Sequence, residues 1–209
     1  MAVWLQAIVT LAPTTTCRHL AEWLSHRGQT DISSRGGHLW GLWDGGSGQG
    51  FDSNEAILMS VWPDDASAGA AVELMKAIPA VIAVSATPLH PTLRPQHNRP
   101  VFGTGLWVFR DFHLPAAELN DFLDQSAAAW EAFEAAADSE VLGLFRCPNE
   151  DAKTASLLLI TRHANLATRE ASHTDNFAPG VIEQINGGHT PTLWSRTRSA
   201  TLQPLPGKT

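Results

Sequence analysis

The chain has 209 residues, 44% of them apolar and 17% charged, with a formal net charge of −7 at pH 7. This composition is typical of a globular protein and excludes general disorder. No clustered run of Lys and Arg interrupts the acidic balance, so we expect no nucleic-acid partner, because phosphate binding needs a basic face. The two cysteines, Cys17 and Cys147, fall at unrelated places, which favours a reducing cytoplasm over a disulfide framework.

The beginning of the chain predicts a strand rather than a targeting signal. Its first charged residue is Arg18, so it lacks the basic segment that opens a signal peptide. Residues 3–10 are apolar and rich in β-branched side chains, which indicates a first strand. No apolar run approaches the ~20 residues of a membrane helix. We therefore expect a cytoplasmic protein without a membrane partner.

The first half of the chain predicts the order β-α-β-β-α-β. After the first strand, Leu20, Trp23 and Leu24 follow helical spacing, and Gly28 is a typical residue for the end of that helix. Asp64 or Asp65 is suited to cap the second helix. The remaining expected elements are strands at 38–43, 56–62 and 81–85, a polar loop at 29–37, and a helix at 66–77.

A glycine-rich stretch, 45–50, lies between two of these strands. A dinucleotide-binding loop would have to open a helix within a strand–helix–strand unit. This stretch leads into another strand, so we interpret it as a hairpin loop.

The second half repeats the same order. Four prolines between residues 88 and 100 predict an extended linker at 89–103. Pro115 suits the first turn of a long helix, and Asn165 is suited to cap a later one. The segment 174–190 exceeds the usual length of a connection, so it is either a functional loop or holds a short helix. The expected elements are strands at 106–110, 141–145, 156–161 and 192–201 and helices at 115–133 and 165–172.

Short motifs recur in the same order in both halves. The run Leu39 to Trp43 returns as Leu142 to Phe145, with Gly41 and Gly143 at matching places. The end of each half matches as well, as Thr92-Leu93-Arg94-Pro95 and Thr201-Leu202-Gln203-Pro204. An internal duplication explains this order. We predict two repeats, 1–88 and 104–209, with both glycines in mid-strand, where a side chain would press on a helix or on the facing sheet.

A β-α-β-β-α-β repeat is the ferredoxin-like split βαβ unit. Its antiparallel sheet carries helices on one face, and an apolar second face has to be covered. The predicted fold is therefore α+β, with two ferredoxin-like repeats packed sheet to sheet as a pseudo-two-fold barrel around a cavity.

Several motifs resemble the NIPSNAP family. They include Gly41-Leu42-Trp43, Trp62-Pro63-Asp64 and Gly143-Leu144-Phe145-Arg146, with further matches at 129–134, 157–162 and 169–172. The chain departs from the family pattern at His163, where an aromatic residue is usual, and at His173, where a basic residue is usual. The resemblance implies membership of the dimeric α+β barrel group, which also holds antibiotic-biosynthesis monooxygenases, polyketide cyclases and haem-degrading enzymes.

The chain has eight tryptophans, nine histidines and no tyrosine. The tryptophans can fill the two cores or line an aromatic cavity. The histidines show no metal-ligand spacing, so no metal site is predicted. We expect no cofactor, although haem needs only one axial histidine, for which His173 is the first candidate.

The strand order groups the polar candidates at two rims. Strand ends should bring Arg110 and Arg146 to one rim, and Glu140, Arg162 and His163 to the other. An arginine at a cavity rim can bind carboxylate, phenolate or enolate oxygens. A histidine there can transfer a proton near neutral pH.

Two hypotheses of different classes follow, and both stay open. The first is a monooxygenase or cyclase that acts on a hydrophobic, polycyclic aromatic molecule. In this hypothesis His163 is the base, Trp43, Trp107 and Trp130 line the pocket, and Arg110 and Arg162 bind the substrate. The second is a non-catalytic NIPSNAP-like binding module, and a haem-binding barrel is a further alternative. Each is compatible with a homo-oligomer.

Overall fold

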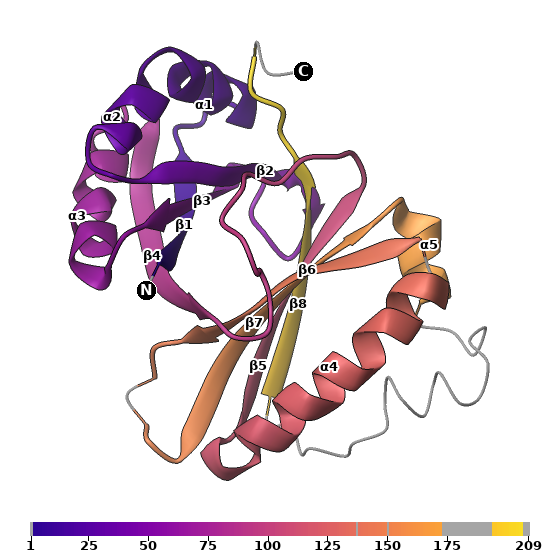
Figure 1. The fold of residues 1–209 in the computed structure, drawn as a ribbon. Helices are drawn as coiled ribbons and strands as arrows, with labels where there is room; N and C mark the ends of the chain where they lie inside the picture. The colour runs from indigo at the N-terminus through magenta and orange to yellow at the C-terminus, as the bar shows by residue number, and fades with distance from the viewer. Residues whose placement is uncertain (1, 137, 150, 173–193, 207–209) are drawn as a thin grey trace. The chain divides into compact units, whose positions relative to one another are not determined.

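The computed structural model describes residues 2–136, 138–149, 151–172 and 194–206 (Figure 1). The chain divides into two compact units. Unit 1 comprises Met1–His90, Asn98–Gly103 and Ser199–Thr209, and unit 2 comprises Pro91–His97 and Thr104–Arg198. The proline-rich segment predicted as a linker is therefore shared between the two units. The predicted segment 174–190 and His173 lie outside the described residues.

Unit 1 has the predicted β-α-β-β-α-β order. A π-helical turn at Leu24–Gly28 connects its first two helices. Its strands lie in the order β4-β1-β3-β2, and every neighbouring pair is antiparallel. The elements are β1 (Val3–Leu11), α1 (Cys17–Trp23), α2 (Gln29–Ser33), β2 (His38–Gln49), β3 (Glu55–Trp62), α3 (Asp65–Lys76) and β4 (Val81–Pro91).

Alternate residues of the strands in unit 1 build a dense core under its helices. Leu5, Ala7 and Val9 of β1 belong to one buried cluster with Ala68 and Ala71 of α3. All five are at most 1% exposed. The small alanines allow the helix to approach the sheet closely, as close packing of a core requires.

Unit 2 follows the same plan with different helices. Its strands lie in the order β8-β5-β7-β6, with β5–β7 and β6–β7 antiparallel. A short 3₁₀ turn, Ala116–Glu118, precedes its long helix. The elements are β5 (Leu106–Pro115), α4 (Leu119–Ala136), β6 (Ser139–Cys147), β7 (Thr154–His163), α5 (Leu166–Ala171) and β8 (Trp194–Leu202). The part of β8 from Ser199 onward belongs to unit 1.

Three local predictions about helix ends meet different outcomes. The predicted caps are confirmed, because Asp64 accepts a hydrogen bond from the Ser67 N–H at 2.8 Å and Asn165 accepts one from the Thr168 N–H at 2.9 Å. The predicted helix end at Gly28 is wrong. The chain continues helically through Gly28 to Ser33, and the glycine is needed because a Cβ there would overlap the Trp23 ring.

The glycine-rich stretch is mostly strand rather than loop. β2 extends to Gln49, so the hairpin turn is shorter than predicted. A Cβ on Gly45 would lie 2.7 Å from the Glu55 carbonyl oxygen, and one on Gly46 would lie 2.6 Å from that of Ser53. These glycines therefore allow the hairpin backbones to approach closely.

Gly41 and Gly143 lie at equivalent points in mid-strand, as predicted. The pairing of β2 with β3 shifts between Leu39 and Gly41, and that of β6 with β7 shifts between Val141 and Gly143. The neighbour predicted for the missing side chain is wrong, however. A Cβ would meet the aromatic ring two residues further along the same strand, Trp43 or Phe145, because side chains two apart share a face.

The end of each repeat hydrogen-bonds to the second strand of a unit. In unit 2, the Thr92 N–H donates to the Leu144 carbonyl at 2.9 Å, and the Leu144 N–H donates to the Arg94 carbonyl at 3.0 Å. In unit 1, the Gln203 N–H donates to the Leu42 carbonyl at 2.8 Å. The motifs at 92–95 and 201–204 therefore both bind the equivalent leucine, through different residues of the motif.

The helices of the described residues are all too short or too polar to cross a lipid bilayer.

Candidate functional site

The strand register of unit 2 sorts its candidate residues onto two faces. Leu106 pairs with His163, Val108 with Thr161 and Arg110 with Leu159. These pairs share a face with Leu157, which packs in a cluster with residues of α4. Trp107 and Arg162 pair with one another and lie on the opposite face, because successive residues of a strand alternate.

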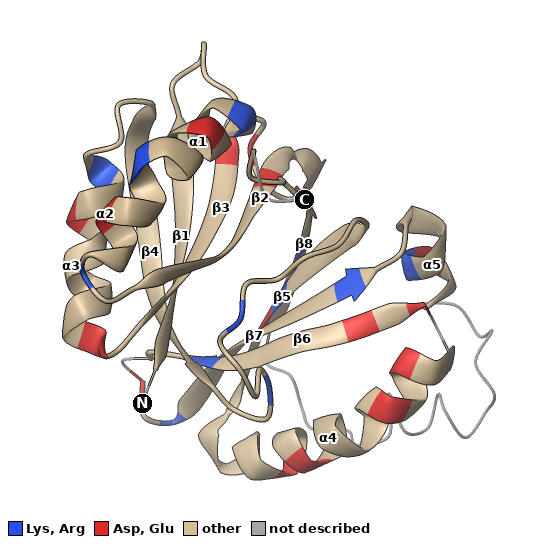
Figure 2. Ribbon diagram, turned by 45° about the horizontal axis from the view of Figure 1, so that its top comes forward, with Lys and Arg blue, Asp and Glu red and all other residues tan. Residues whose placement is uncertain are grey.

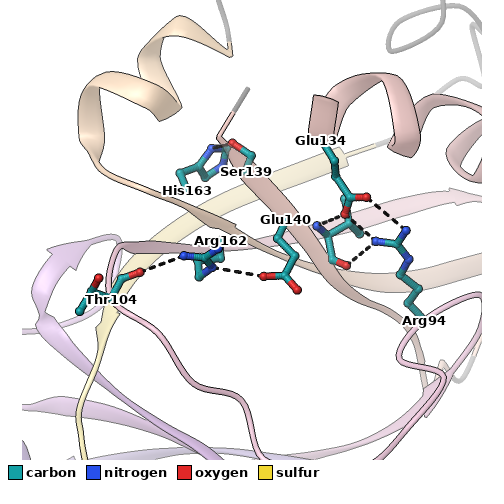
Figure 3. Close-up of polar contacts among 8 residues, drawn as sticks. Arg94, Thr104, Glu134, Ser139, Glu140, Arg162 and His163 are labelled. Carbon is teal, nitrogen blue, oxygen red and sulfur yellow. Dashed lines mark hydrogen bonds and ion pairs between the residues drawn. The ribbon is translucent and has the colours of Figure 1, made fainter. Parts of the chain in front are cut away.

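His163 is buried on the helix-covered face. Its side chain is 4% exposed, and it is the last residue of β7. Nδ1 lies 2.7 Å from Ser139 Oγ (Figure 3). Nε2 lies 3.4 Å from Thr161 Oγ1. The Phe133 ring stands edge-on with its centroid 6.1 Å from that of the imidazole. Hydroxyl groups therefore contact both ring nitrogens.

Trp62 of unit 1 is the counterpart of His163. Each is the last residue of the third strand of its repeat and stands two positions before the helix cap. Trp62 donates its indole N–H to Ser60 Oγ at 2.8 Å. In the same way, His163 contacts the hydroxyl of Thr161, which also lies two residues earlier in its strand. Gly37 adjoins the Trp62 ring, whereas Ser139 occupies that place beside His163. In unit 2 the imidazole of His163 and the hydroxyl of Ser139 therefore take the places of the Trp62 indole and of Gly37.

Arg162 is held on the other face of the sheet. Its Nε lies 3.3 Å from a carboxylate oxygen of Glu140, and its Nη1 donates to the Thr104 carbonyl at 3.3 Å (Figure 3). The predicted grouping of Glu140 with Arg162 is therefore present in the structure. His163 is next to Arg162 in the chain, but its side chain leaves the opposite face.

Arg110 lies in the middle of β5 rather than at a rim. The sequence prediction ended this strand at Arg110, whereas β5 continues to Pro115. Arg110 donates from Nε to Thr197 Oγ1 at 3.3 Å, and its guanidinium lies 5.9 Å from the Phe112 ring centroid. Burial lowers the pKa of the Arg110 guanidinium, and the positive charge of Arg169 lowers it further. Arg146 lies on β6, which β7 separates from β5.

The three predicted tryptophans belong to three different elements. Trp130 lies on α4, is 8% exposed and carries the Arg94 guanidinium 5.1 Å from its ring centroid. Trp107 lies on the opposite face of the sheet, and Trp43 belongs to unit 1, where its ring packs near Trp40 at 6.0 Å between centroids. All of these side chains except Trp130 are at most 1% exposed, so they are packed core residues.

Arg94 makes contacts that the sequence analysis missed. Its guanidinium binds Glu134 with two hydrogen bonds, at 2.6 and 3.2 Å, and donates to the Val141 carbonyl at 2.8 Å. Glu134 also accepts a hydrogen bond from the Val141 N–H at 2.7 Å (Figure 3). The internal repeat could have drawn attention to Arg94, because a charged residue stands there at the position where the second repeat has the neutral Gln203.

The remaining titratable groups offer little chemistry of their own. Within the described part of the chain, no group of three or more His, Cys, Asp and Glu side chains could hold a metal ion. Burial raises the pKa of the Cys147 thiol to about 12 and raises that of the Cys17 thiol further. Both thiols therefore stay protonated and unreactive near neutral pH.

Four of the described histidines make contacts that do not fit the haem alternative. An axial ligand needs a ring nitrogen that faces an internal space. The ring nitrogens of His163 face Ser139 and Thr161, and His113 Nδ1 lies 3.2 Å from Ser156 Oγ. His38 binds the Asn98 carbonyl, and His19 belongs to a helix cap. We derive no step that uses haem.

Comparison with solved structures shows what the fold is similar to. A protein from Lactobacillus acidophilus that is provisionally named a monooxygenase has a TM-score of 0.52 at 14% identity, with 97% of this chain and 93% of that chain covered. An anthrone oxidase-like protein has a TM-score of 0.56 at 10% identity, with 97% and 91% covered. Chlorite dismutase from Candidatus Nitrospira defluvii has a TM-score of 0.61 at 8% identity, with 98% and 92% covered.

These likenesses establish the fold and nothing finer. The chain has the α+β fold of the dimeric α+β barrel proteins, as the sequence predicted. No family model matches the chain, and no curated protein matches it either.

Proposed function

We propose that the protein is a small-molecule oxygenase that binds a hydrophobic aromatic substrate between α4 and the sheet of unit 2. The observation that supports this is the incomplete burial of aromatic side chains in that layer. Phe112, Phe122 and Phe133 are only half-buried there, although they pack against the buried cluster around Leu157 and Trp130. The equivalent layer of unit 1 holds a larger cluster of buried side chains, with residues such as Trp23 and Leu39 half-buried at its edge. Half-buried aromatic side chains are the usual lining of a site for an apolar ligand.

Single positions show the contrast between the two layers. Val9 pairs with Ala56 in unit 1, and Phe112 pairs with Leu157 in the corresponding place of unit 2. Val9 is fully buried, whereas Phe112 is half-buried and meets Phe122 of α4 edge-on at 5.3 Å between ring centroids. The helix-facing side of the unit 2 sheet therefore carries a larger side chain at this position, and solvent partly reaches it.

The chemistry we propose needs no base from the protein if the substrate carries an acidic oxygen or an acidic C–H group. Arg110 is a cation on this same face, and it would stabilise the phenolate or enolate form of the substrate. That anion is electron-rich and reacts with O₂. One oxygen atom converts a CH₂ carbon to a carbonyl, and the second oxygen leaves as water with the two hydrogens of that carbon. The names of the monooxygenase and of the anthrone oxidase-like protein agree with such a reaction.

Oxygen consumption with a panel of anthrones and naphthols tests the proposal. Oxygen uptake with ¹⁸O from labelled O₂ in the product is the expected result. The variant Phe122→Ala should raise KM about tenfold, because a buried phenyl contributes on the order of 1.5–3 kcal/mol. Phe102→Ala is the matched control, since Phe102 is 71% exposed. Binding without oxygen uptake by any member of the panel would overturn the oxygenase.

The second candidate is a NIPSNAP-like binding module without chemistry. The contacts of His163 favour it, because hydroxyl groups contact both ring nitrogens and a general base needs a nitrogen directed at the substrate. Ligand binding in the layer with no turnover is the result that this candidate predicts.

A further inference from the structure

The register of the two units places Arg110 where unit 1 has a buried alanine. In unit 1, Leu58 of β3 pairs with Leu42 of β2 on one side and with Ala7 of β1 on the other. In unit 2, Leu159 of β7 pairs with Leu144 on one side and with Arg110 on the other. Leu42 and Leu144 are the equivalent leucines of the repeated motif. Arg110 therefore occupies the position of Ala7, which is 0% exposed beneath the helices of unit 1.

The helix that follows the third strand shows a second replacement of the same kind. Asp64 caps α3 through the N–H of Ser67, and Asn165 caps α5 through the N–H of Thr168. Each cap stands two positions after the strand end. The residue after the bonded N–H is Ala68 in unit 1 and Arg169 in unit 2. Ala68 is also 0% exposed and belongs to the same cluster as Ala7.

The two arginines stand at positions whose counterparts in unit 1, Ala7 and Ala68, belong to one buried cluster. Burial lowers the pKa of Arg110, and the positive charge of Arg169 lowers it further, so the two guanidinium groups lie near one another. Two cations brought together at a helix–sheet layer repel one another, and desolvation adds to the cost. A core that only needed to be filled would use alanines, as unit 1 does.

The described surroundings of the pair do not neutralise it. Arg110 contacts a neutral hydroxyl on Thr197 and the Phe112 ring. The Nε of Arg169 is buried and has no hydrogen-bond partner among the described residues. The carboxylate next to Arg110 in sequence, Asp111, lies on the opposite face and binds Arg198 at 2.9 Å. Such a pair is suited to receive an anionic oxygen from outside the protein.

We propose that Arg110 and Arg169, with the hydroxyl of Thr197, form a recognition site for the carboxylate of an aromatic acid whose apolar body lies against Phe112. The site belongs to the layer named in the proposed function and rests on that placement. It goes further by requiring an anionic substituent on the ligand. Arg169 is the residue that sets this requirement, because Arg110 alone would serve a neutral enol or phenol as well.

Calorimetric titration with 2-naphthoate and 2-naphthamide tests the site. The two probes share shape and aromatic body and differ in charge. The wild-type protein should bind naphthoate at least about tenfold more tightly than naphthamide, since a hydrogen bond to a charged group is typically worth a factor of that size. Arg110→Ala and Arg169→Ala should each remove most of this preference, and the double variant should bind both probes equally. Arg169→Lys should keep part of it.

The fold itself supplies a second readout. Because unit 1 tolerates alanine at both positions, the double variant should melt at a temperature no lower than that of the wild type. Arg18→Ala is the control, since Arg18 is 80% exposed and pairs with Glu22 one helical turn away. This variant should leave both the preference and the melting temperature unchanged.

Four results overturn the proposal: no naphthoate binding at millimolar concentration, equal binding of both probes by the wild type, a preference that survives in the double variant, and a double variant that unfolds. The failure of the oxygenase is a separate result. Arginine-dependent naphthoate binding without oxygen uptake supports this site and overturns the proposed reaction. Oxygen uptake with equal binding of both probes supports the reaction and overturns this site.

Discussion

The ring of Phe145 occupies the space that a side chain on Gly143 would need. We therefore expect Gly143→Val to destabilise the protein by roughly 1–3 kcal/mol, because overpacking forces the ring or the strand to move. Chemical denaturation measures this change. Gly69→Ala in α3 is the control, since a Cβ there meets nothing within 4 Å and should stabilise the helix by about 0.5–1 kcal/mol. An unchanged midpoint for Gly143→Val would contradict the assigned packing.

His163 and Ser139 should behave as a matched pair with Trp62 and Gly37. His163→Trp alone should be destabilising, because the Ser139 hydroxyl stands where Gly37 leaves room for an indole ring. Adding Ser139→Gly should recover on the order of 1 kcal/mol or more, as expected for side chains in contact. A double-mutant cycle in urea provides the measurement, and additive effects would show that the two repeats are not equivalent here.

The role of His163 as a base stays a prediction, and kinetics can test it. If His163 takes a proton from the substrate, His163→Gln should lower kcat about 10²- to 10⁴-fold while the protein remains folded. The packing role predicts a lower melting temperature and a kcat close to that of the wild type. Measuring both quantities on the same variant separates the two roles.

Arg94 should contribute to the stability of unit 2 far more than a surface arginine does. Its side chain is 33% exposed, and it binds Glu134 and a backbone carbonyl together. We expect Arg94→Ala to cost about 1–3 kcal/mol, the range for hydrogen bonds to charged groups. Arg18→Ala should cost within about 0.5 kcal/mol, as exposed ion pairs do. Equal losses for the two variants would contradict the contacts seen for Arg94.

The buried thiols predict a pH effect of definite sign. An unfolded thiol ionises near its ordinary pKa of 9.0, whereas folding raises the pKa of Cys147 to about 12. The contribution of this group to stability is therefore complete below pH 9 and is lost as the pH rises toward 12. In practice, a disulfide reagent at pH 8 should label neither cysteine until urea unfolds the protein. Rapid labelling of the native protein would contradict the raised pKa of both thiols.

The sequence predicted the order of elements well because periodicity and capping are local signals. Asp64 and Asn165 marked helix starts correctly, and the repeated motif around Gly41 and Gly143 located equivalent strands. Gly28 misled the prediction because the same residue serves helix ends and close ring packing, and only the Trp23 contact distinguishes the two.

The candidate site was harder to predict because it depends on which face a side chain takes. His163 and Arg162 are neighbours in the chain but leave opposite faces of the sheet. Arg110 looked like a strand end because the polar residue Asp111 follows it, whereas β5 continues for five more residues to Pro115. The significance of Arg169 emerged only from the register, which aligns it with Ala68.

Because a ribosome makes the chain in order, unit 1 stays incomplete until the stretch that begins at Ser199 has been made. Met1–His90 emerges early, yet the same unit also contains the stretch that begins at Ser199, whose Leu202 pairs with Trp43. A nascent first half therefore exposes a stretch of β2 that stays without its final partner while residues 91–198 are still being translated. Unit 1 therefore cannot complete its folding during synthesis before unit 2 is made, as an amino-terminal domain usually does. Truncation at the carboxyl terminus should consequently damage the part of the protein that was synthesised first.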